Sequence, residues 1–360
     1  MDYQLELIDV AKQYKEFLAV DSVNLQIEKG EIVSFLGASG CGKTTTLRMI
    51  AGLIEPTRGT IRIQGRDMNG IPPHKRDISM VFQNYALFPH LSVYENIVYG
   101  LKTRKIKDKK VLMEKAREMM NLVQLEGVEN RLPKELSGGQ QQRVSLARAM
   151  IVEPKVMLFD EPLSNLDAKL REKTRVEIRN LLKKMNVTAI YVTHDQEEAL
   201  TISDRIAVMN KGRIEQFTEP SSLYTRPATR FIAGFVGHAN IVEGSVTKAT
   251  EDRFAVKLTS GEEIWAKADP VKKAAAGDGA VLIIRPENIR LHDEKPDKSN
   301  ILSGTVKAKI YLGSTLRYVI EMAGNNDFEV DLHTKDEGRA VEGDMIYLEL
   351  DENGLILVER

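Results

Sequence analysis

This sequence of 360 residues has almost no cysteine, no long apolar run and no excess of charge of either sign. Its one cysteine, Cys41, excludes an internal disulfide framework and a zinc site built from cysteines. The 51 basic and 52 acidic residues nearly cancel, so no overall basic field points to a nucleic-acid partner. No apolar run approaches the roughly 20 residues of a membrane span. The first six residues have neither the basic start nor the apolar core of a signal peptide. We therefore expect a cytosolic chain that reaches a membrane only through a partner.

What the sequence does contain is a glycine-rich loop, Gly37 to Thr45, between an apolar run at Ile32–Leu36 and an expected helix at Thr46–Ala51. A buried strand, a glycine-rich loop and a helix with Lys-Thr in its first turn form the phosphate-binding P-loop. Lys43 suits the β- and γ-phosphates of a nucleotide, and the Thr44 hydroxyl suits Mg²⁺. The expected phosphate-binding residues are Gly37, Ala38, Ser39, Gly40, Cys41, Gly42, Lys43, Thr44 and Thr45.

Three other apolar runs each end in a side chain suited to metal or proton chemistry. The run Val156–Phe159 leads into Asp160 and Glu161, which is the Walker B pattern. Asp160 would hold Mg²⁺, usually through water, and Glu161 would take a proton from the attacking water. His194 and Gln83 follow two further runs, at the strand ends where α/β sheets bind ligands. Gln83 by itself is a weak signal, and a lone histidine is more often structural.

The region from about 88 to 155 is mainly helical in its pattern. Its apolar residues recur at helical spacing, which predicts a core-facing stripe: Leu112, Ala116, Met119, Met120 and Val123. Further on, Ser137, Gly138 and Gly139 precede a predicted helix at Val144–Ile151. A serine and glycines there make an anion-ready helix start, although a simple helix cap is the more usual meaning of this pattern.

The pattern changes near residue 237 to short alternating strands separated by glycine turns. We therefore predict two domains: an α/β P-loop NTPase domain at 1–236, with a helical subdomain at about 88–155, and a small all-β, barrel-like domain at 237–360. The segment Asn240–Val246 resembles Asn300–Val306, which predicts two similar halves in the second domain. The charged segment Asp293–Ser299 would link these halves.

Together these motifs resemble the ATPase of ABC transporters over residues 3–236. The P-loop, Leu136-Ser137-Gly138-Gly139-Gln140 and Asp160-Glu161 occur in that order, and the serine-glycine-glycine-glutamine signature separates them from kinases, GTPases and motor ATPases. The β region, with Ile284–Asn288, resembles the C-terminal OB-like TOBE extension of importer ATPases of the maltose, polyamine, sulfate and ferric-iron type. The whole chain thus resembles the ATP-binding subunit of a solute importer.

The resemblance implies roles for individual residues. ATP and Mg²⁺ would be the cofactors, with Thr44, Gln83 and Asp160 around the metal. Glu161 would be the general base, and Lys43, Gln83 and His194 would complete the catalytic set. Tyr14, which by itself is typical of a half-buried surface residue, would stack on adenine. Ser137 and Gly139 would contact the γ-phosphate of ATP bound to a second subunit.

The resemblance also implies partners. The chain would form a head-to-tail homodimer that works with two membrane-spanning permease subunits at the cytoplasmic face of the cell membrane. The region around Gln83–Phe88 would dock a helix of the membrane subunit. An extracytoplasmic solute-binding protein would be an indirect partner. Local likeness favours polyamine, ferric iron or phosphonate over sugars as the solute.

Three alternatives stay open at this stage. An ABC ATPase of DNA repair or chromosome structure would carry a long coiled coil or zinc insertion, whereas only about 90 residues separate P-loop and signature, with no long heptad run. The β domain could chiefly bind a small ligand or a regulatory protein. An exporter would usually lack such a β extension.

Overall fold

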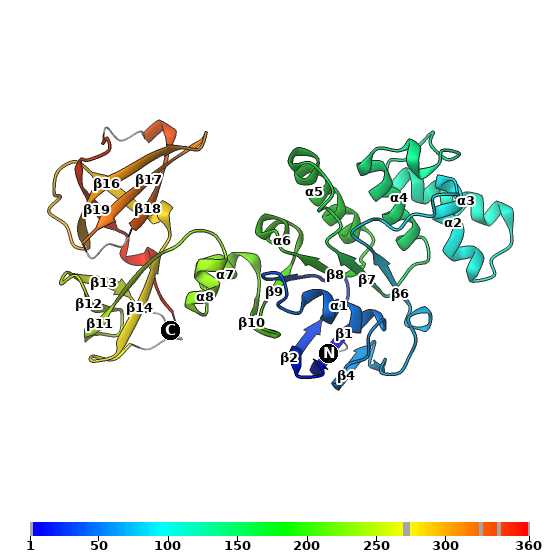
Figure 1. Cartoon of the computed structure of the whole chain (residues 1–360), viewed down its shortest axis with the longest axis horizontal. Helices are drawn as coiled ribbons and strands as arrows, with labels where there is room; N and C mark the ends of the chain where they lie inside the picture. The colour runs from blue at the N-terminus through cyan, green and yellow to red at the C-terminus, as the bar shows by residue number, and fades with distance from the viewer. Residues whose placement is uncertain (1–2, 269–273, 324–326, 337–339, 359–360) are drawn as a thin grey trace. The chain divides into compact units, whose positions relative to one another are not determined.

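The computed structural model of the chain describes residues 3–268, 274–323, 327–336 and 340–358. It divides into two compact units, Met1–Ser221 and Ser222–Arg360 (Figure 1). The predicted boundary after residue 236 lies further along the chain, beyond the short helices α7 (Pro220–Thr225) and α8 (Arg230–Phe235). The domain boundary between residues 236 and 237 stays a prediction. No helix among the described residues is both long and apolar enough to cross a bilayer.

A six-stranded sheet forms the centre of the first unit, in the order β10-β9-β3-β8-β7-β6. Five of its strands run parallel, and β10 pairs antiparallel to β9. The strands are β3 (Ile32–Leu36), β6 (Ile78–Val81), β7 (Val156–Asp160), β8 (Thr188–Thr193), β9 (Arg205–Asn210) and β10 (Arg213–Thr218). Because β3 and β8 are buried at every residue, they form the middle of the core. A parallel sheet brings the carboxyl ends of its strands to one edge, and the predicted site residues follow those ends.

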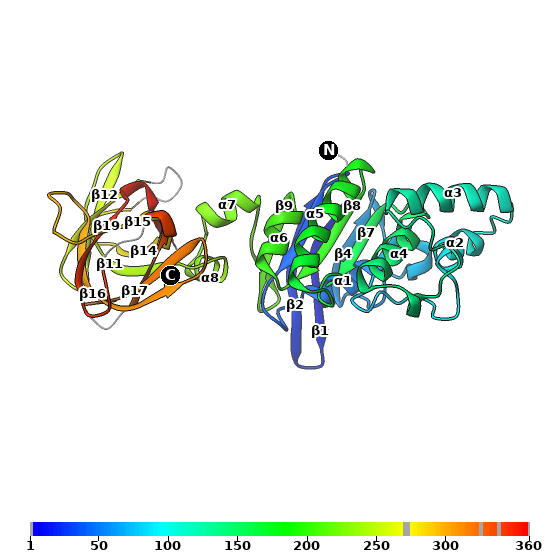
Figure 2. The ribbon, with the colours of Figure 1, turned by 90° about the horizontal axis from the view of Figure 1, so that it is seen from above.

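Helices and a second sheet cover the two faces of this sheet. Helix α1 (Lys43–Ala51) lies on one face, with the four-stranded sheet β2-β1-β4-β5 beyond it, and α5 (Ala168–Lys184) and α6 (Gln196–Ile202) lie on the other face (Figures 1 and 2). The strands of the second sheet are β1 (Leu5–Tyr14), β2 (Phe17–Ile27), β4 (Arg58–Ile63) and β5 (Arg66–Asp67). This layering buries α1 between two sheets and fixes the loop that precedes it.

The predicted helical region forms a cluster of three helices. These are α2 (Val93–Thr103), α3 (Lys109–Leu122) and α4 (Gly138–Met150). The predicted stripe on α3 is buried in their common core, as expected for i, i+4, i+7 spacing. Helix α4 begins at Gly138, six residues before the predicted Val144, because Ser137 and Gln140 form a capping box there.

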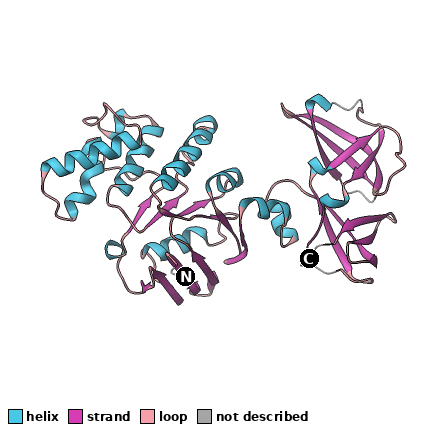
Figure 3. Ribbon diagram, turned by 180° about the vertical axis from the view of Figure 1, so that it is seen from behind, coloured by secondary structure: helices cyan, strands magenta, loops and turns pink. Residues whose placement is uncertain are grey.

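The second unit consists mainly of strands (Figure 3). They form two five-stranded sheets, β13-β12-β11-β14-β20 and β15-β19-β16-β17-β18. The first half of the unit contributes β11 (Asn240–Ala249), β12 (Arg253–Leu258), β13 (Glu263–Lys267), β14 (Gly279–Ile284) and β15 (Ile289–His292). The second half contributes β16 (Ile301–Tyr311), β17 (Thr315–Met322), β18 (Asp327–His333), β19 (Met345–Leu350) and β20 (Leu355–Val358). The last strand of each half has crossed into the sheet of the other half.

The pairing pattern confirms that Asn240–Val246 and Asn300–Val306 lie in equivalent strands. β11 pairs with β12 and β14, and β16 pairs in the same way with β17 and β19. A register shift follows Val246 on β11 and Val306 on β16. The asparagines are equivalent too, although Asn300 immediately precedes its strand: Asn240 exchanges two hydrogen bonds of 2.7 Å with the backbone of Glu329, and Asn300 does the same with Trp265. Each half thus binds the backbone of the other half through one buried side-chain amide.

Candidate active site

The predicted site residues lie at the carboxyl edge of the six-stranded sheet. The P-loop follows β3, Glu161 follows β7, and His194 follows β8. The register places Leu36 opposite Thr193 and Asp160 opposite Val192, so these three strand ends are level with one another. The fold therefore brings together residues that are more than 100 positions apart in the sequence.

Close packing explains why the loop needs glycine at two positions. A Cβ atom at Gly37 would lie 2.3 Å from the carbonyl oxygen of Met209. Gly42 has φ of 107°, and a Cβ there would lie 2.7 Å from the carbonyl oxygen of Ala19. The loop is also held by the hairpin between β9 and β10, where the Gly212 N–H donates to the Cys41 carbonyl at 3.0 Å. Neighbouring strands thus shape the loop.

Lys43 is buried, with 5% of its surface exposed. Its Nζ donates to the carbonyl oxygens of Gly37 at 2.7 Å and Ala38 at 2.9 Å, and lies 3.7 Å from Cys41 Sγ. The ammonium is therefore held at the centre of the loop. A compact cation at the centre of a glycine-rich loop that leads into a helix N-terminus suits phosphate oxygens.

Thr44 and Asp160 meet across the gap between α1 and β7. Thr44 Oγ1 donates to Asp160 Oδ1 at 3.3 Å. Burial raises the pKa of the Asp160 carboxyl, the charge of Glu161 adds to that effect, and Arg48 and the Thr44 hydrogen bond oppose it. The donors are a hydroxyl and one carboxylate, which fit Mg²⁺ because this ion keeps several waters and binds few protein groups. No cluster of three or more carboxylate, histidine or cysteine side chains that could hold a metal occurs in the described part of the chain.

Glu161 and His194 form the second pair at this edge. His194 Nδ1 lies 3.3 Å from Glu161 Oε2, and 59% of the histidine side chain is exposed. The backbone of Glu161 has φ of 46°, a left-handed conformation that is uncommon for a residue with a side chain. Its N–H donates to the Val192 carbonyl at 3.1 Å, which ties it to β8. This backbone sets where the carboxylate points.

Gln83 lies two residues beyond the end of β6, which ends at Val81. Its side chain is exposed, and its carbonyl accepts a hydrogen bond of 2.8 Å from Asn165 Nδ2. The following turn is held by α4: Ser145 Oγ and Arg148 Nη2 both donate to the Tyr85 carbonyl at 2.9 Å. The Gln83–Phe88 segment is therefore anchored to the helical cluster.

Ser137 and Gly139 lie at the exposed start of α4. Ser137 forms a reciprocal capping box with Gln140, and its carbonyl accepts from the Gln141 N–H. A Cβ at Gly139 would lie 3.3 Å from Leu170 Cδ2, so this helix start packs beside the start of α5. The first N–H groups of a helix have no partner within the helix, which leaves this end ready for an anion.

Tyr14 is the last residue of β1 and pairs with Phe17, the first residue of β2. Tyr14 is 44% exposed, and Lys12 Nζ lies 5.1 Å from the centroid of its ring. Phe17 is 64% exposed and is a second candidate for stacking that sequence reasoning missed. From Phe17 to Ala19, where β2 passes the P-loop, is about 7 Å along the strand.

Sequence reasoning also missed the residues that support the site. Arg171 on α5 contacts both the Leu166 carbonyl and Asp195, and Glu198 on α6 accepts from the hydroxyls of Tyr191, at 2.6 Å, and Thr193. Burial raises the pKa of Glu198. No sequence signal marks these residues, because their partners lie on other elements.

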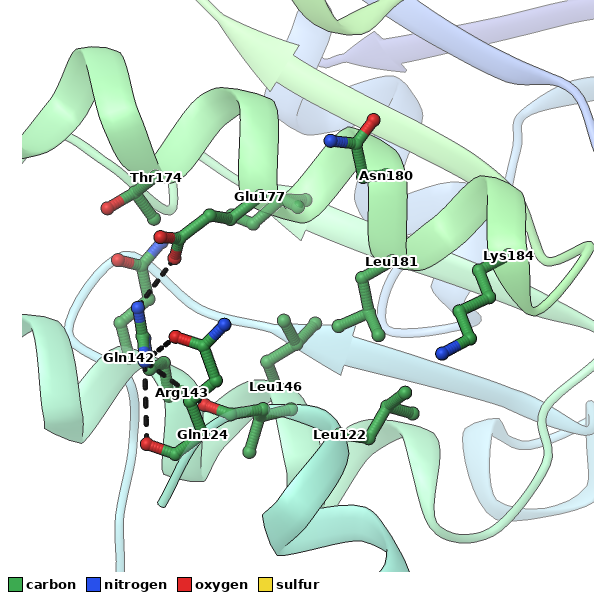
Figure 4. Close-up of a pocket in the computed structure, with 12 residues that line it drawn as sticks. Leu122, Gln124, Gln142, Arg143, Leu146, Thr174, Glu177, Asn180, Leu181 and Lys184 are labelled. Atoms are coloured by element: carbon green, nitrogen blue, oxygen red, sulfur yellow. Dashed lines mark hydrogen bonds and ion pairs between the residues drawn. The ribbon is translucent and has the colours of Figure 1, made fainter. Parts of the chain in front are cut away.

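A cavity of about 260 Å³ lies elsewhere, between the end of α3, α4 and α5 (Figure 4). None of the predicted site residues lines it. An ion pair of 2.6 Å between Arg143 and Glu177 borders it and joins α4 to α5. The cavity therefore belongs to the junction between the helical cluster and the core, and not to the phosphate site.

The chain is similar in sequence to known proteins. A model of the ABC transporter family matches residues 20–164, and a model of the TOBE domain matches residues 282–358. The spermidine/putrescine import ATP-binding protein of Rubrobacter xylanophilus is 46% identical over 316 residues, covering 88% of this chain and 83% of that one. The Fe(3+) ions import ATP-binding protein of Brucella melitensis is 47% identical over 323 residues, covering 90% and 89%.

Two solved structures each resemble about three fifths of the chain. CbiO1 from Clostridium perfringens, part of an ABC transporter complex, has a TM-score of 0.58 and 26% identity, covering 62% of this chain and 91% of that one. The ATP-binding cassette MJ0796, a dimer in a post-hydrolysis state with ADP and Pi, has a TM-score of 0.54 and 33% identity, covering 60% and 98%.

Proposed function

Because this chain belongs to the family of ABC transporter ATP-binding subunits, we propose that the edge of its six-stranded sheet hydrolyses ATP to power import of a small polar solute. The observation that carries the proposal is the contact between Thr44 and Asp160, at 3.3 Å. It joins the P-loop to the acidic strand end, so phosphate-binding and metal-binding groups converge on one place. Two runs of sequence 116 residues apart meet there.

Each residue of the edge has one task in the proposed reaction. Lys43 and the loop amides hold the phosphate tail, and Mg²⁺ when bound would neutralise charge between Thr44, Gln83 and Asp160. Glu161 accepts the proton of the attacking water, and His194 contacts the γ-phosphate. Phosphoryl transfer to water needs positioning and charge stabilisation more than covalent chemistry, which matches this set.

We propose that two subunits form a head-to-tail dimer with ATP between them. The start of α4, with Ser137 and Gly139, supplies N–H groups that need an anion. The γ-phosphate on the partner's P-loop provides it, so ATP closes the dimer. Hydrolysis removes this bridge, and the dimer opens. Tyr14 stacks on adenine at the tip of the β1–β2 hairpin.

Two membrane-spanning permease subunits take up this motion at the Gln83–Phe88 segment. Support comes from its anchoring: Arg148 donates to the carbonyls of Tyr85 and Ala86, and its guanidinium lies 5.3 Å from the Phe88 ring centroid. A displacement of this segment would therefore be transmitted to α4 and to Ser137 and Gly139 at the start of that helix. The subunit would sit peripherally on the cytoplasmic face of the membrane, with a solute-binding protein on the far side.

For the solute we favour a polyamine or ferric iron, in line with the names of the relatives. The two relatives described above are named for polyamine and for ferric-iron import, and neither is named for phosphonate. Selectivity would lie in the membrane and solute-binding subunits.

The second unit offers a further candidate role as a regulatory module. A polar cavity of about 400 Å³ lies between β15, β19 and the segment before β16, lined by residues such as Arg290, Lys298 and Glu349. A small ligand or a regulatory protein would bind the second unit, and its binding would change the rate of ATP turnover. Pull-down with residues 240–360 tests for such a partner.

The decisive experiment measures ATP hydrolysis by the purified chain against its own concentration, with Mg²⁺. A rate per subunit that rises with concentration supports a dimeric ATPase. A rate that is independent of concentration contradicts the shared site. If hydrolysis is absent even when the permease subunits are added, the proposed function fails.

A further inference from the structure

The connection between α2 and α3 carries a concentrated positive charge. Six basic residues and one acid, Asp108, occur in the nine residues from 102 to 110, in a chain whose net charge is −1. All six basic side chains are exposed. We call this set the basic connection; its members are Lys102, Arg104, Lys105, Lys107, Lys109 and Lys110.

Most of this positive charge has no carboxylate of the described residues as an ion-pair partner. Arg104 reaches Asp77 at 3.7 Å and the Val152 carbonyl at 2.7 Å. Within the residues that the structure describes, no carboxylate lies within ion-pair distance of the five lysines of the basic connection. Asp108 is engaged as a helix cap, since its side chain accepts from the Lys110 N–H at 2.8 Å. The charge is therefore available to an outside partner.

Two of the lysines occupy positions that oppose helix stability. Lys109 and Lys110 open α3, whose first turn has no acidic residue. A helix N-terminus carries partial positive charge and is stabilised by acids, so lysines there are unfavourable. Asp108 caps this helix end, but lysines rather than acids occupy the first turn, and this departure from the usual preference points to a function outside the protein.

We propose that the basic connection binds the anionic headgroups of the membrane surface. Lysine is a compact, hydrated point charge on a flexible stem, suited to diffuse negative surfaces rather than to one fixed carboxylate. Met113, one turn into α3, is 59% exposed and gives the patch an apolar side chain beside its charges. Glu114 and Glu118 lie further along the same helix, where they line a hollow together with Lys110 and Met113.

The basic connection begins at the end of α2, beside the segment proposed to dock the permease, which fits a membrane surface as its partner; this step rests on the proposed function. Phe88, in the segment proposed to dock the permease, packs 4.5 Å from Tyr99 on α2, measured between ring centroids. Lys102 follows Tyr99 by three residues, which is one helical turn or about 5 Å. The basic connection thus continues from the surface that the permease would occupy.

Vesicle co-sedimentation of the full chain tests the proposal. The probes are phosphatidylcholine vesicles and vesicles with about one third phosphatidylglycerol, at low and high salt. We expect binding to the anionic vesicles only, and loss of binding at high salt. The triple variant Lys107→Glu, Lys109→Glu, Lys110→Glu should weaken binding by about 100-fold or more, at about fivefold for each lysine near the surface.

A matched control carries Lys29→Glu, Lys75→Glu and Lys295→Glu, three exposed lysines elsewhere in the chain. It should bind nearly as tightly as the wild type. The basic-connection variant should also melt at the same or a higher temperature, because glutamates suit the start of α3. A loss of binding in that variant therefore cannot come from unfolding.

Three outcomes would overturn the proposal: no binding of the wild type to anionic vesicles, equal binding by the variant, or equal losses in variant and control. Tight binding to purified permease or to RNA, sensitive to the same reversals while vesicles do not bind, would assign the patch to that partner instead. ATP hydrolysis measured on the same samples separates the membrane-binding proposal from the proposed ATPase function. The rate of hydrolysis should be unchanged in the basic-connection variant. Vesicle binding by a chain that shows no hydrolysis even with the permease subunits added would contradict only the proposed function.

Discussion

At the scale of single residues, Glu161 has its carboxylate fixed by a left-handed backbone and by His194. Glu161→Gln keeps the shape and removes the proton acceptor. We expect unchanged ATP binding and a turnover lower by about 10²–10⁴, the usual contribution of a general base. Binding titrations and steady-state rates measure both. Glu197→Gln, at an exposed carboxylate two residues after Asp195, is the control, and an equal loss there would contradict the assignment.

Asp160 sets a second prediction at this scale, because its carboxyl has a raised pKa in the folded protein. The folded protein then holds the proton more tightly than the unfolded chain, whose carboxyl has a pKa of about 3.9. The stability contribution is present at low pH and is lost as pH rises through the raised pKa. Asp160→Asn should therefore raise the melting temperature at pH 7 without nucleotide, by an amount that shrinks toward pH 4. A difference that grows on acidification would contradict this, and Mg²⁺-dependent ATP binding should weaken in the variant.

At the scale of elements, α5 links two loops of the site through Arg171. Its Nη2 donates to the Leu166 carbonyl at 3.0 Å, and its Nη1 lies 3.5 Å from Asp195 Oδ2. Leu166 precedes α5, and Asp195 follows His194. The guanidinium therefore ties the position of His194 to the loop beside the signature helix.

A lysine at position 171 can serve only one of these two partners. Arg171→Lys should lower kcat for ATP about tenfold, as expected for one charge-assisted hydrogen bond, and leave KM nearly unchanged. Arg175→Lys is the matched control one turn along α5, because Arg175 pairs with Glu197 and with neither loop. Equal effects of the two substitutions would show a general role of α5 rather than a link between loops.

The exchanged halves of the second unit allow a stability prediction for paired elements. Asn240→Ala and Asn300→Ala each leave one N–H and one C=O of the other half without a partner. Each should lower the free energy of unfolding by about 2–4 kcal/mol, and by similar amounts. Trp265, the only tryptophan, reports unfolding of this unit by fluorescence. The exposed Asn353→Ala is the control, and strongly unequal losses at the two buried sites would contradict their equivalence.

At the scale of the whole molecule, a shared site predicts complementation between two inactive chains. Lys43→Ala removes the phosphate lysine, and Ser137→Arg blocks the signature end. In a mixed head-to-tail dimer, both changes fall in one site and the other site is intact. The mixture should reach up to about a quarter of the wild-type rate if the two sites act independently. A mixed rate equal to the sum of the separate rates would contradict the sharing of sites between subunits.

Several features followed from the sequence because neighbouring residues determine them. The P-loop context, the capping at Ser137 and the buried stripe on α3 depend on contacts within a few positions. The repeat was visible because Asn240 and Asn300 occupy matching places in both halves. The boundaries of elements were predicted less exactly. Helix α4 starts six residues before the predicted Val144, because the polar residues Gln140–Gln142 do not show the apolar spacing of a helix.

The sequence by itself determined which chemistry is present: a loop for phosphates, strand ends with acids, and two halves of one β unit. Only the tertiary structure decided how these parts are connected. Arg171, Asn165 and Arg148 act on loops from other elements, and β15 and β20 cross into the opposite sheets. Residue spacing encodes backbone conformation over short distances, whereas such contacts depend on how distant elements pack, which no local pattern specifies.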